Sequence, residues 1–436
     1  MNWDLISHLT WRANNMANVS SSNGLENRPK LRFPGFDEPW KETTLSAIFI
    51  KNIKKNTDGK ITNVICNSAK FGLISQREYF DKDIANRNNI NNYYIIHKSD
   101  FVYNPRKSTD APYGPISSYK YSKDGIVSPL YLCFRAKFEI NPLYFEWYFR
   151  SSVWHRYVYM SGDSGARHDR VSIKDDVFFA MPINIPSEQE QSKIASFLQS
   201  LDERIAAQSQ LIDTLKKYKR GLSNVLFDGL LEDSNSHLCT FGNVMTILQN
   251  NTFSRDDLSS GCDEIRNIHY GDVLIKYGAL VDFRNAIIPS IKADRDISKF
   301  SESSYLQNGD VVFADTAEDY TVGKATEIIG AENVAALSGL HTIPCRPQKK
   351  FAPMYLGYYF NSDYFKRQLY PMIQGTKVSS ISKSEMVKSK IIIPNMQLQN
   401  RIASILKALD DRIDAAKLTS ARIMEFRKGL LQQLFI

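Results

Sequence analysis

Long apolar runs are absent from this sequence of 436 residues. No stretch approaches the ~18 to 20 consecutive apolar residues that a membrane-spanning helix needs. The N-terminal stretch also lacks the basic and then apolar pattern of a secretory signal peptide. These absences predict a chain with no membrane partner that works in the cytoplasm.

Cysteine is scarce and scattered. The five cysteines are an odd number, and no two of them form a CxxC pair that would start a zinc site or a redox motif. We therefore expect reduced, structural thiols and no metal site. The cysteines are Cys66, Cys133, Cys239, Cys262 and Cys345.

Catalytic motifs are missing as well. There is no GxxxxGK[ST] loop for ATP and no paired His or Cys spacing for a metal ion. DNA methylation would need an Asn/Asp-Pro-Pro-aromatic motif, whereas the nearest strings, at Asn104 and Asn141, contain one proline. His168 and Asp169 form a lone His-Asp dipeptide, which is typical of a protein surface. The sequence predicts no catalytic residue and no cofactor bound by this chain.

The composition is that of a globular protein with two or three domains, at 43% hydrophobic and 23% charged residues. The net charge is +8; residues 25–184 hold 24 Lys+Arg against 17 Asp+Glu, whereas residues 237–390 hold 17 of each. A basic balance suits a polyanion, because Lys and Arg that neutralise phosphates release counterions. Charge alone leaves open a mildly basic surface without such a partner.

An internal repeat is the most informative feature of the sequence. Residues 185–227 align without a gap to residues 393–435, at a constant offset of 208. Chance does not give such agreement over forty residues. Identical pairs include Pro186/Pro394, Gln189/Gln397, Gln191/Gln399, Ile194/Ile402, Asp202/Asp410, Arg204/Arg412, Gly221/Gly429 and Phe227/Phe435.

Each copy carries the heptad rhythm of a coiled coil, with apolar residues at spacings of four and three. Ser187 followed by Glu190 predicts a capping box, and Asn395 is placed to cap the second copy. About forty helical residues make a rod of about 60 Å. The expected helix-pairing seam is Ile194, Leu198, Leu201, Ile205, Ile212, Leu215, Leu222 and Leu226 with Ile402, Leu406, Leu409, Ile413, Ile423, Leu430 and Leu434.

Polar residues interrupt both seams, and such positions commonly fix register and partner choice. They are Gln208, Lys219, Ser420 and Arg427. We expect the two helices to pair with each other, antiparallel, within one chain. Two separate amphipathic helices, each lying on its own domain, remain the alternative.

The two segments that precede the helices have short alternating apolar runs and many turn formers, which predicts β-rich or mixed α/β structure. Weak correspondences extend the repeat into them: residues 97–103 resemble 307–313, and residues 141–145 resemble 352–356. The latter pair introduces two expected aromatic helices, Tyr144–Tyr159 and Tyr355–Tyr370. The expected limits are an extension over 1–24, domains over 25–184 and 233–392, and helices over 185–232 and 393–436.

The loops of both segments combine Arg, Lys, Asn, Ser and Tyr with turn formers, the residues that reach phosphates and base edges. For any single side chain a solvated surface role stays open. The DNA-binding candidates are Lys70, Gln76, Arg77, Tyr79, Arg106, Lys107, Tyr113, Tyr119, Lys120, Tyr121, Arg167, His168, Arg170, Lys276, Tyr277, Arg284, Tyr320, Lys324, Lys377, Ser379 and Ser380.

With the repeat in hand, the sequence resembles the specificity subunit of type I restriction-modification enzymes over nearly the whole chain from about Lys30. The resemblance rests on an opening motif, Leu31-Arg-Phe-Pro-Gly-Phe36 with Trp40, and on the run LISQREYF at Leu73–Phe80. It also rests on the duplicated helices, which begin with IPxxxEQxxI-type sequences and end with RGL-xxx-LF and KGL-xxx-LF. The second segment departs from the family pattern, because it begins at His237 without a clear copy of the opening motif.

The resemblance implies an α+β fold: two mixed α/β, β-rich target recognition domains separated by two long antiparallel coiled-coil helices, with a pseudo-twofold internal repeat. Each domain would read one half of a bipartite site in double-stranded DNA. The helices would set the gap and dock two modification (methyltransferase) subunits, which recruit restriction (motor-nuclease) subunits. S-adenosylmethionine, ATP and Mg²⁺ are then expected only in those partners. A coiled-coil scaffold protein with incidental DNA affinity and an orphan methyltransferase are the rival hypotheses.

Overall fold

The computed structural model describes residues 27–79, 87–162, 169–260, 264–375 and 377–436. The chain divides into two compact units. The first unit contains Met1–Gln208 and Thr419–Ile436, and the second contains Ser209–Leu418. Each unit therefore holds one of the two segments together with a part of both long helices. The domain limits expected from the sequence stay a prediction.

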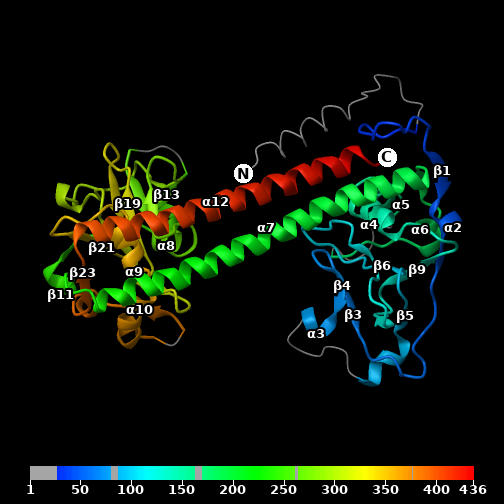
Figure 1. Cartoon of the computed structure of the whole chain (residues 1–436). Helices are drawn as coiled ribbons and strands as arrows, with labels where there is room; N and C mark the ends of the chain where they lie inside the picture. Colours follow the sequence, from blue (N-terminus) through cyan, green and yellow to red (C-terminus); the bar gives the residue numbers. More distant parts are fainter. Residues whose placement is uncertain (1–26, 80–86, 163–168, 261–263, 376) are drawn as a thin grey trace. The chain divides into compact units, whose positions relative to one another are not determined.

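The two repeated sequences form the long helices α7 (Glu188–Asp228) and α12 (Met396–Gln433), of 41 and 38 residues. α12 lies alongside α7 and runs in the opposite direction in both units (Figure 1). In the first unit, Leu430 and Leu434 of α12 share a core with Ile194 and Leu198 of α7. In the second unit, Phe227 at the end of α7 shares a core with the start of α12. The antiparallel pairing expected from the sequence is confirmed.

Most seam positions are buried. In the first copy the side chain of Leu198 is 0% exposed, and in the second copy that of Ile402 is 0% exposed. The half-buried exceptions are Ile212, Leu222, Leu226 and Ile423.

The polar seam residues Lys219 and Arg427 are the two copies of one repeat position, and each binds a copy of one aspartate. In the second unit the Lys219 ammonium lies 2.5 Å from the Asp410 carboxylate. In the first unit the Arg427 guanidinium pairs with Asp202. Because the offset is 208 for both members, the two ion pairs are one interaction made twice.

The first unit is an antiparallel sheet framework with short helices. A four-stranded sheet has the order β2-β9-β6-β7, and three two-stranded sheets are β1-β10, β3-β4 and β5-β8. The strands are β1 (Lys41–Thr44), β2 (Phe49–Lys51), β3 (Ile65–Ser68), β4 (Gly72–Ser75), β5 (Tyr94–Ile96), β6 (Phe101–Tyr103), β7 (Ile116–Ser118), β8 (Gly125–Val127), β9 (Leu132–Ala136) and β10 (Pro182–Ile185). The helices are α2 (Leu45–Ile48), α3 (Gln76–Tyr79), η1 (Arg87–Asn92), α4 (Pro142–Arg150), α5 (His155–Ser161) and α6 (Asp175–Phe179).

The second unit has a five-stranded sheet of order β12-β21-β17-β19-β15, a four-stranded sheet β13-β16-β14-β20, and the pairs β11-β23 and β18-β22. The strands are β11 (His237–Thr240), β12 (Met245–Ile247), β13 (Leu258–Ser259), β14 (Arg266–Ile268), β15 (Leu280–Asp282), β16 (Ser290–Ile291), β17 (Val311–Ala314), β18 (Thr316–Ala317), β19 (Ala325–Ile329), β20 (Ala336–Ser338), β21 (Thr342–Pro347), β22 (Ser379–Ser380) and β23 (Lys390–Ile393). The helices are η2 (Gly229–Leu231), η3 (Phe241–Asn243), η4 (Arg255–Asp257), α8 (Tyr270–Ile275), η5 (Glu302–Ser304), α9 (Tyr355–Phe360), α10 (Asp363–Leu369), η6 (Tyr370–Met372) and α11 (Lys383–Met386).

The two frameworks correspond strand by strand. The order β2-β9-β6-β7 in the first unit matches β12-β21-β17-β19 in the second. The turn before β6 has Ser99 at φ 70°, and the turn before β17 has Gly309 at φ 85°. The carboxylates that follow, Asp100 and Asp310, each accept hydrogen bonds from one arginine on the neighbouring strand. The weak correspondence in sequence therefore marks the same turn in the same sheet.

Aromatic residues join each framework to the end of a long helix. In the first unit, Tyr144 of α4 packs against Phe435 with ring centroids 5.6 Å apart. In the second unit, Tyr359 of α9 packs against Phe227, also at 5.6 Å. Phe227 and Phe435 are copies of one repeat position, so the core of each unit is closed by the same residue.

The expected aromatic helices are each broken in two, which corrects the sequence prediction. Ser151 follows α4, and its hydroxyl donates to the carbonyl of Tyr148 at 2.6 Å. Ser362 follows α9 and donates to the carbonyl of Tyr359, also at 2.6 Å. A serine hydroxyl that takes up a late carbonyl competes with the next helical turn, and the chain restarts as α5 or α10.

The capping box expected at the start of α7 is only half formed. The backbone N–H of Glu190 donates to the Ser187 hydroxyl at 3.3 Å. The Glu190 carboxylate does not turn back to Ser187, because it accepts from Arg32 at 2.8 and 2.9 Å and from the Trp40 indole at 3.2 Å. The opening motif thus closes over the first turn of α7. At the start of α12, the Asn395 side chain caps the helix as expected.

No helix in the described ranges combines the length and apolarity required to cross a membrane. The four cysteines in those ranges carry free thiols.

Candidate nucleic-acid interface

A basic groove of about 670 Å³ lies in the first unit. Its walls bring together four of the DNA-binding candidates: Lys70, Arg106, Lys107 and Arg170. Asp110 is the one acidic residue among its lining side chains in the described part of the chain. The groove therefore collects cations from three loops that are far apart in the sequence.

Backbone pairing holds two of these loops together. Arg106 and Arg170 face each other in an antiparallel β-bridge. The N–H of Lys107 donates to the carbonyl of Asp169 at 2.9 Å, and the N–H of Val171 donates to that of Pro105 at 2.8 Å. Both arginines are fixed at their backbones while their side chains reach the groove, an arrangement suited to a phosphate chain.

A buried asparagine forms the floor of the groove and was missed from the sequence. The Asn67 amide donates to the carbonyls of Val102 and Pro115 at 2.7 and 3.0 Å, and its side-chain oxygen accepts from Ser117 at 2.9 Å. Asn67 is 3% exposed. It connects the loop that carries Lys70 to the central sheet, so the groove is preformed. Nothing in the sequence separates this asparagine from the many others.

Burial raises the pKa of the Cys66 thiol, which also lines this groove, to about 11. The thiol is therefore uncharged at neutral pH and does not oppose an anion. In the described ranges, no three His, Cys, Asp or Glu side chains gather as they would around a metal ion.

The remaining candidates of the first unit lie apart from the groove. Gln76 and Arg77 lie on α3, with Gln76 half-buried and Arg77 exposed; Tyr79 ends that helix. Lys120 is exposed, but its ammonium lies 3.1 Å from the Glu146 carboxylate. The candidates Arg167 and His168 lie outside the described residues.

The aromatic candidates of the first unit differ in exposure. Tyr121 is 44% exposed and is accessible to a base, whereas Tyr113 is half-buried with its ring 4.6 Å from that of His155. Tyr119 is 1% exposed, and its hydroxyl donates to the carbonyl of Lys123. Its side chain belongs to the core, which removes Tyr119 from the DNA-binding set.

In the second unit the short sheet β18-β22 gathers a second group of candidates. Ser379 and Ser380 pair with Ala317 and Thr316 across this sheet. Tyr320, in the loop that follows β18, is 88% exposed. Lys377 is exposed just before β22. These four candidates lie in two loops joined by one short sheet, which is also how the first unit joins its loops at Arg106 and Arg170.

The other candidates of the second unit are partly neutralised or buried. The Arg284 guanidinium lies 2.8 Å from the Asp282 carboxylate and lowers its pKa. The Lys276 ammonium lies 2.9 Å from the buried Asp272. Tyr277 is 7% exposed in a core cluster, so it too is removed from the DNA-binding set.

A further group of cations was missed, because the sequence was read at this place for its helix seam, in which Lys219 was noted only as a polar interruption. Lys216, Lys219 and Arg220 of α7 line a pocket of about 390 Å³ with the candidate Lys324. The local signal was the run Lys-Lys-Tyr-Lys-Arg at 216–220, with four cations in five residues.

The duplicated framework and the paired helices agree with the comparisons to known proteins. Residues 38–217 and 245–423 each match the family described as type I restriction modification DNA specificity domain. The chain belongs to this family.

A curated relative agrees with this assignment. The type I restriction enzyme MjaVIII specificity subunit of Methanocaldococcus jannaschii is 23% identical over 277 residues, which are 59% of this chain and 62% of that protein. The chain thus spans 62% of the length of this curated relative.

Solved structures show the same fold. A chain from a structure described as the basis of complex assembly and conformational transition of the type I R-M system has a TM-score of 0.58 and 16% identity, over 92% of this chain and 98% of that one. The S subunit of a type I restriction-modification system from M. genitalium has a TM-score of 0.50 and 15% identity, over 94% of this chain and 99% of that one.

Proposed function

We propose that the chain is the non-catalytic subunit that recognises DNA sequence in a type I restriction-modification enzyme and acts on DNA in the cytoplasm. Each unit reads one half of a bipartite site in double-stranded DNA. Methylation and ATP-dependent cleavage belong to partner subunits, which hold S-adenosylmethionine, ATP and Mg²⁺. The observation that carries the proposal is one framework built twice, with matching strand order but different loops.

The difference between the loops supports recognition of two different half-sites. The first unit offers a groove with Lys70, Arg106 and Arg170. At its own short loop sheet, the second unit offers Tyr320 and two serines. Arginine and lysine suit phosphates and guanine edges, whereas serine and tyrosine suit other base edges and sugars. Equal frames with unequal loops fit two unequal sequences.

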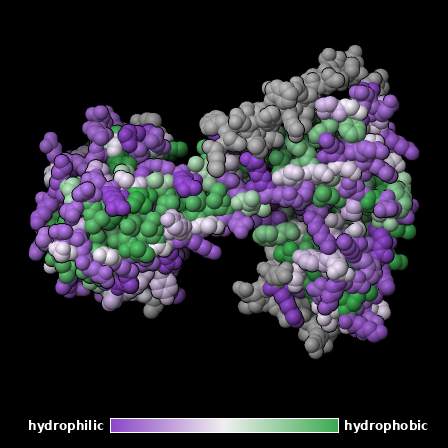
Figure 2. Space-filling model, in the orientation of Figure 1, coloured by the Kyte–Doolittle hydropathy of each residue, from purple (hydrophilic) through white to green (hydrophobic). Residues whose placement is uncertain are grey.

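The outer face of the long helices supports docking of two modification subunits. Leu211, Tyr218 and Val225 of α7 are 44%, 59% and 71% exposed, at intervals of seven residues. Figure 2 shows apolar residues gathered along the paired helices of the second unit. A seven-residue apolar stripe left open on a helix suits a partner helix. Restriction subunits join through the modification subunits.

Exchange of one segment tests two-part recognition. Replacing residues 237–390 with the matching segment of a relative should change only one half of the methylated sequence in the host genome. The chain with its own segment restored is the control. A folded, active chimera that changes both halves would refute separate reading.

An insertion tests whether the helices set the gap. Four residues added near Gln208 lengthen α7 by about 6 Å, nearly two base-pair steps, because a helix rises 1.5 Å per residue. The paired helices should absorb the insertion by local unwinding. Methylome sequencing should then show the same half-sites with a longer gap. An unchanged gap in an active insertion variant would leave the helices as docking surfaces only.

A gel-shift assay at moderate salt separates this proposal from a protein-only scaffold, with the modification subunit present to complete the DNA clamp. Specific retention of one duplex supports recognition; equal retention of all duplexes supports the scaffold hypothesis. Photo-crosslinking of S-adenosylmethionine to the isolated chain would favour an orphan methyltransferase.

A further inference from the structure

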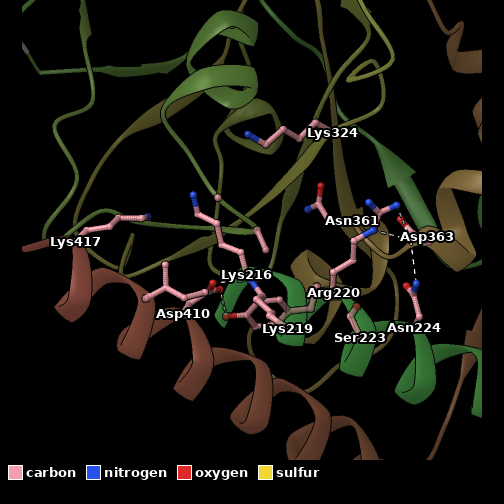
Figure 3. A pocket seen from close by; sticks show the side chains of 14 residues that line it. Lys216, Lys219, Arg220, Ser223, Asn224, Lys324, Asn361, Asp363, Asp410 and Lys417 are labelled. Atoms are coloured by element: carbon pink, nitrogen blue, oxygen red, sulfur yellow. Dashed lines mark hydrogen bonds and ion pairs between the residues drawn. The ribbon is translucent and has the colours of Figure 1, made fainter. Parts of the chain in front are cut away.

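The pocket of about 390 Å³ in the second unit lies between the basic face of α7, the middle of α12 and the framework (Figure 3). Cations from three elements line it: Lys216, Lys219 and Arg220 from α7, Lys417 from α12 and Lys324 from the framework. Its carboxylates come from two aspartates, so cations outnumber anions among its lining residues in the described ranges.

Both carboxylates already have partners. Asp363 accepts from Arg220 at 3.1 and 3.2 Å and from the Asn224 amide at 3.0 Å. Asp410 accepts from Lys219 at 2.5 Å and from the Tyr358 hydroxyl at 2.9 Å. Neither carboxylate is therefore left to neutralise the other lysines of the pocket.

Two lysines keep an uncompensated charge. Lys216 makes no hydrogen bond or ion pair with the described residues, and the ammonium of Lys324 donates only to the carbonyl of Leu274, at 2.7 Å. Burial and the nearby charge of Lys366 lower the pKa of Lys324. A lysine held beside another cation without an acid gains most from an added anion.

The corresponding place in the first unit differs at these two positions. The copy of Lys216 in α12 is Met424. In the second unit the N–H of Ala314 donates to the carbonyl of Lys324, and in the first unit the N–H of Asn104 donates to the carbonyl of Pro115. Pro115 therefore stands where the second unit has Lys324. The frame itself does not require a lysine at either place, which fits a ligand role for the two side chains.

We propose that this pocket binds a phosphate group, supplied by the backbone of the DNA that the second unit contacts. The pocket lies at the end of the loop Thr316–Lys324, and Tyr320 in that loop is a base-reading candidate. A DNA strand that follows the loop would bring one of its phosphodiester groups to Lys324 and Lys216. The Ser223 hydroxyl on α7 adds a neutral donor. The DNA source rests on the proposed function, whereas the phosphate chemistry rests on the pocket alone.

The test uses the variant Lys216→Gln/Lys324→Gln and the control Lys349→Gln/Lys350→Gln, which removes two exposed lysines of the same unit outside the pocket. Glutamine keeps a donor for the Leu274 carbonyl. In the first arm, hydrogen exchange of the second unit is measured in the full chain with inorganic phosphate or with chloride at equal ionic strength, because the groove of the first unit is also suited to phosphate. We expect phosphate to slow exchange around the pocket in the natural chain and the control, but not in the pocket variant.

The second arm measures DNA binding by the chain assembled with its modification subunits. The slope of log affinity against log salt should fall by about 1 in the pocket variant, one phosphate contact, and stay unchanged in the control. Duplexes with single neutral methylphosphonates should identify one position that weakens binding of the natural chain and has no effect on the pocket variant.

The outcomes separate the two claims. One such methylphosphonate position supports the DNA source. Slower exchange around the pocket in inorganic phosphate, without any such position, overturns the DNA source and keeps the phosphate site. Absence of both effects overturns the pocket proposal, even when the natural chain binds its DNA site. Failure of the natural chain to prefer any sequence overturns the proposed function, and the first arm still decides the pocket.

Discussion

The junction between sheet and helix is built oppositely in the two units. In the first unit the carboxylate comes from the helix: Glu146 of α4 accepts from the Ser118 hydroxyl on β7 at 2.8 Å. In the second it comes from the sheet: Glu327 of β19 accepts from the backbone N–H of Met354 and Gly357 at 2.6 and 2.8 Å. A duplicated frame thus keeps an interaction while exchanging the element that supplies it.

The exchange changes the charge balance. Glu146 lies 2.7 Å from the Arg150 guanidinium and 3.1 Å from the Lys120 ammonium. Among the described residues, no Lys, Arg or His pairs with Glu327, which receives only N–H groups. A Cβ at Gly357 would lie 2.2 Å from the Ala279 carbonyl oxygen, so the helix of the second unit cannot supply a side chain here. In the first unit the buried Glu146 is neutralised by cations, whereas in the second unit the buried Glu327 receives only backbone hydrogen bonds.

The starts of the long helices differ in the same way. Glu190 in α7 has Arg32 and Trp40 as partners, and the repeat places Leu398 at the same position in α12. The opening motif therefore supplies partners for the buried carboxylate of Glu190. The second segment has no clear copy of the motif, which fits the apolar Leu398 at the matching position of α12.

The largest effect should come from breaking that contact. Arg32→Leu leaves the Glu190 carboxylate, 1% exposed, without its cation. We expect the first unit to lose about 4 kcal/mol of unfolding free energy. Hydrogen exchange, followed separately in the first and second units, measures this loss of unfolding free energy. The double variant Arg32→Leu/Glu190→Leu, which copies Leu398, should recover most of the loss. A loss located in the second unit would contradict the contact.

A smaller effect concerns pH and the second unit. Burial raises the pKa of Glu327 from 4.5 to about 7. Because the folded value lies above the unfolded one, its stabilisation is complete below about pH 4.5 and is lost as pH rises through about 7. The shift corresponds to about 3 kcal/mol. Glu327→Gln should remove this pH dependence in denaturant unfolding. An unchanged slope in that variant would locate the titration elsewhere.

Next in size are the two copies of the seam ion pair. Asp202→Asn and Asp410→Asn should each cost about 1 kcal/mol, because the pairs are only partly buried. Asp202 also binds Arg150 at 3.0 Å, whereas Asp410 also binds a neutral tyrosine, so the Asp202 variant should lose more and depend more on salt. Unfolding at two salt concentrations measures the difference. Equal salt dependence would mean that Arg150 adds nothing.

The smallest effect compares the two matching turns. Gly309→Ala should cost about 1 kcal/mol, because the left-handed backbone disfavours a side chain. Ser99→Gly should gain about 0.5 kcal/mol, since relief of that strain is offset by a freer unfolded chain. Thermal unfolding of both variants checks the signs. Loss of stability in Ser99→Gly would show that the serine side chain stabilises its turn.

The sequence predicted the parts of the fold that repeat. The heptads predicted α7, α12 and their antiparallel pairing, because apolar spacing along a helix needs no knowledge of tertiary partners. It missed interactions that join distant segments. The carboxylate of Glu190 was expected to cap its own helix, yet it binds residues 150 and 158 positions away.

The candidate interface was predicted as loops rather than as residues. Composition selected the loops that carry Lys70, Arg106 and Arg170, and the structure places them in one groove. Composition could not separate Tyr119, which is buried, from Tyr121, which is exposed two residues later. The exposure of each tyrosine depends on the contacts that its side chain makes in the folded unit, and composition does not encode those contacts.

The packing of α12 reverses the order in which the units can be completed on the ribosome. Leu430, Leu434 and Phe435 belong to the core of the first unit, although they are translated after the whole second unit. At ~5 to 20 residues per second, the interval between Leu201 and these residues lasts roughly 10 to 50 seconds. During that time the nascent first unit keeps an apolar face open to chaperones. The unit that is translated first is finished last.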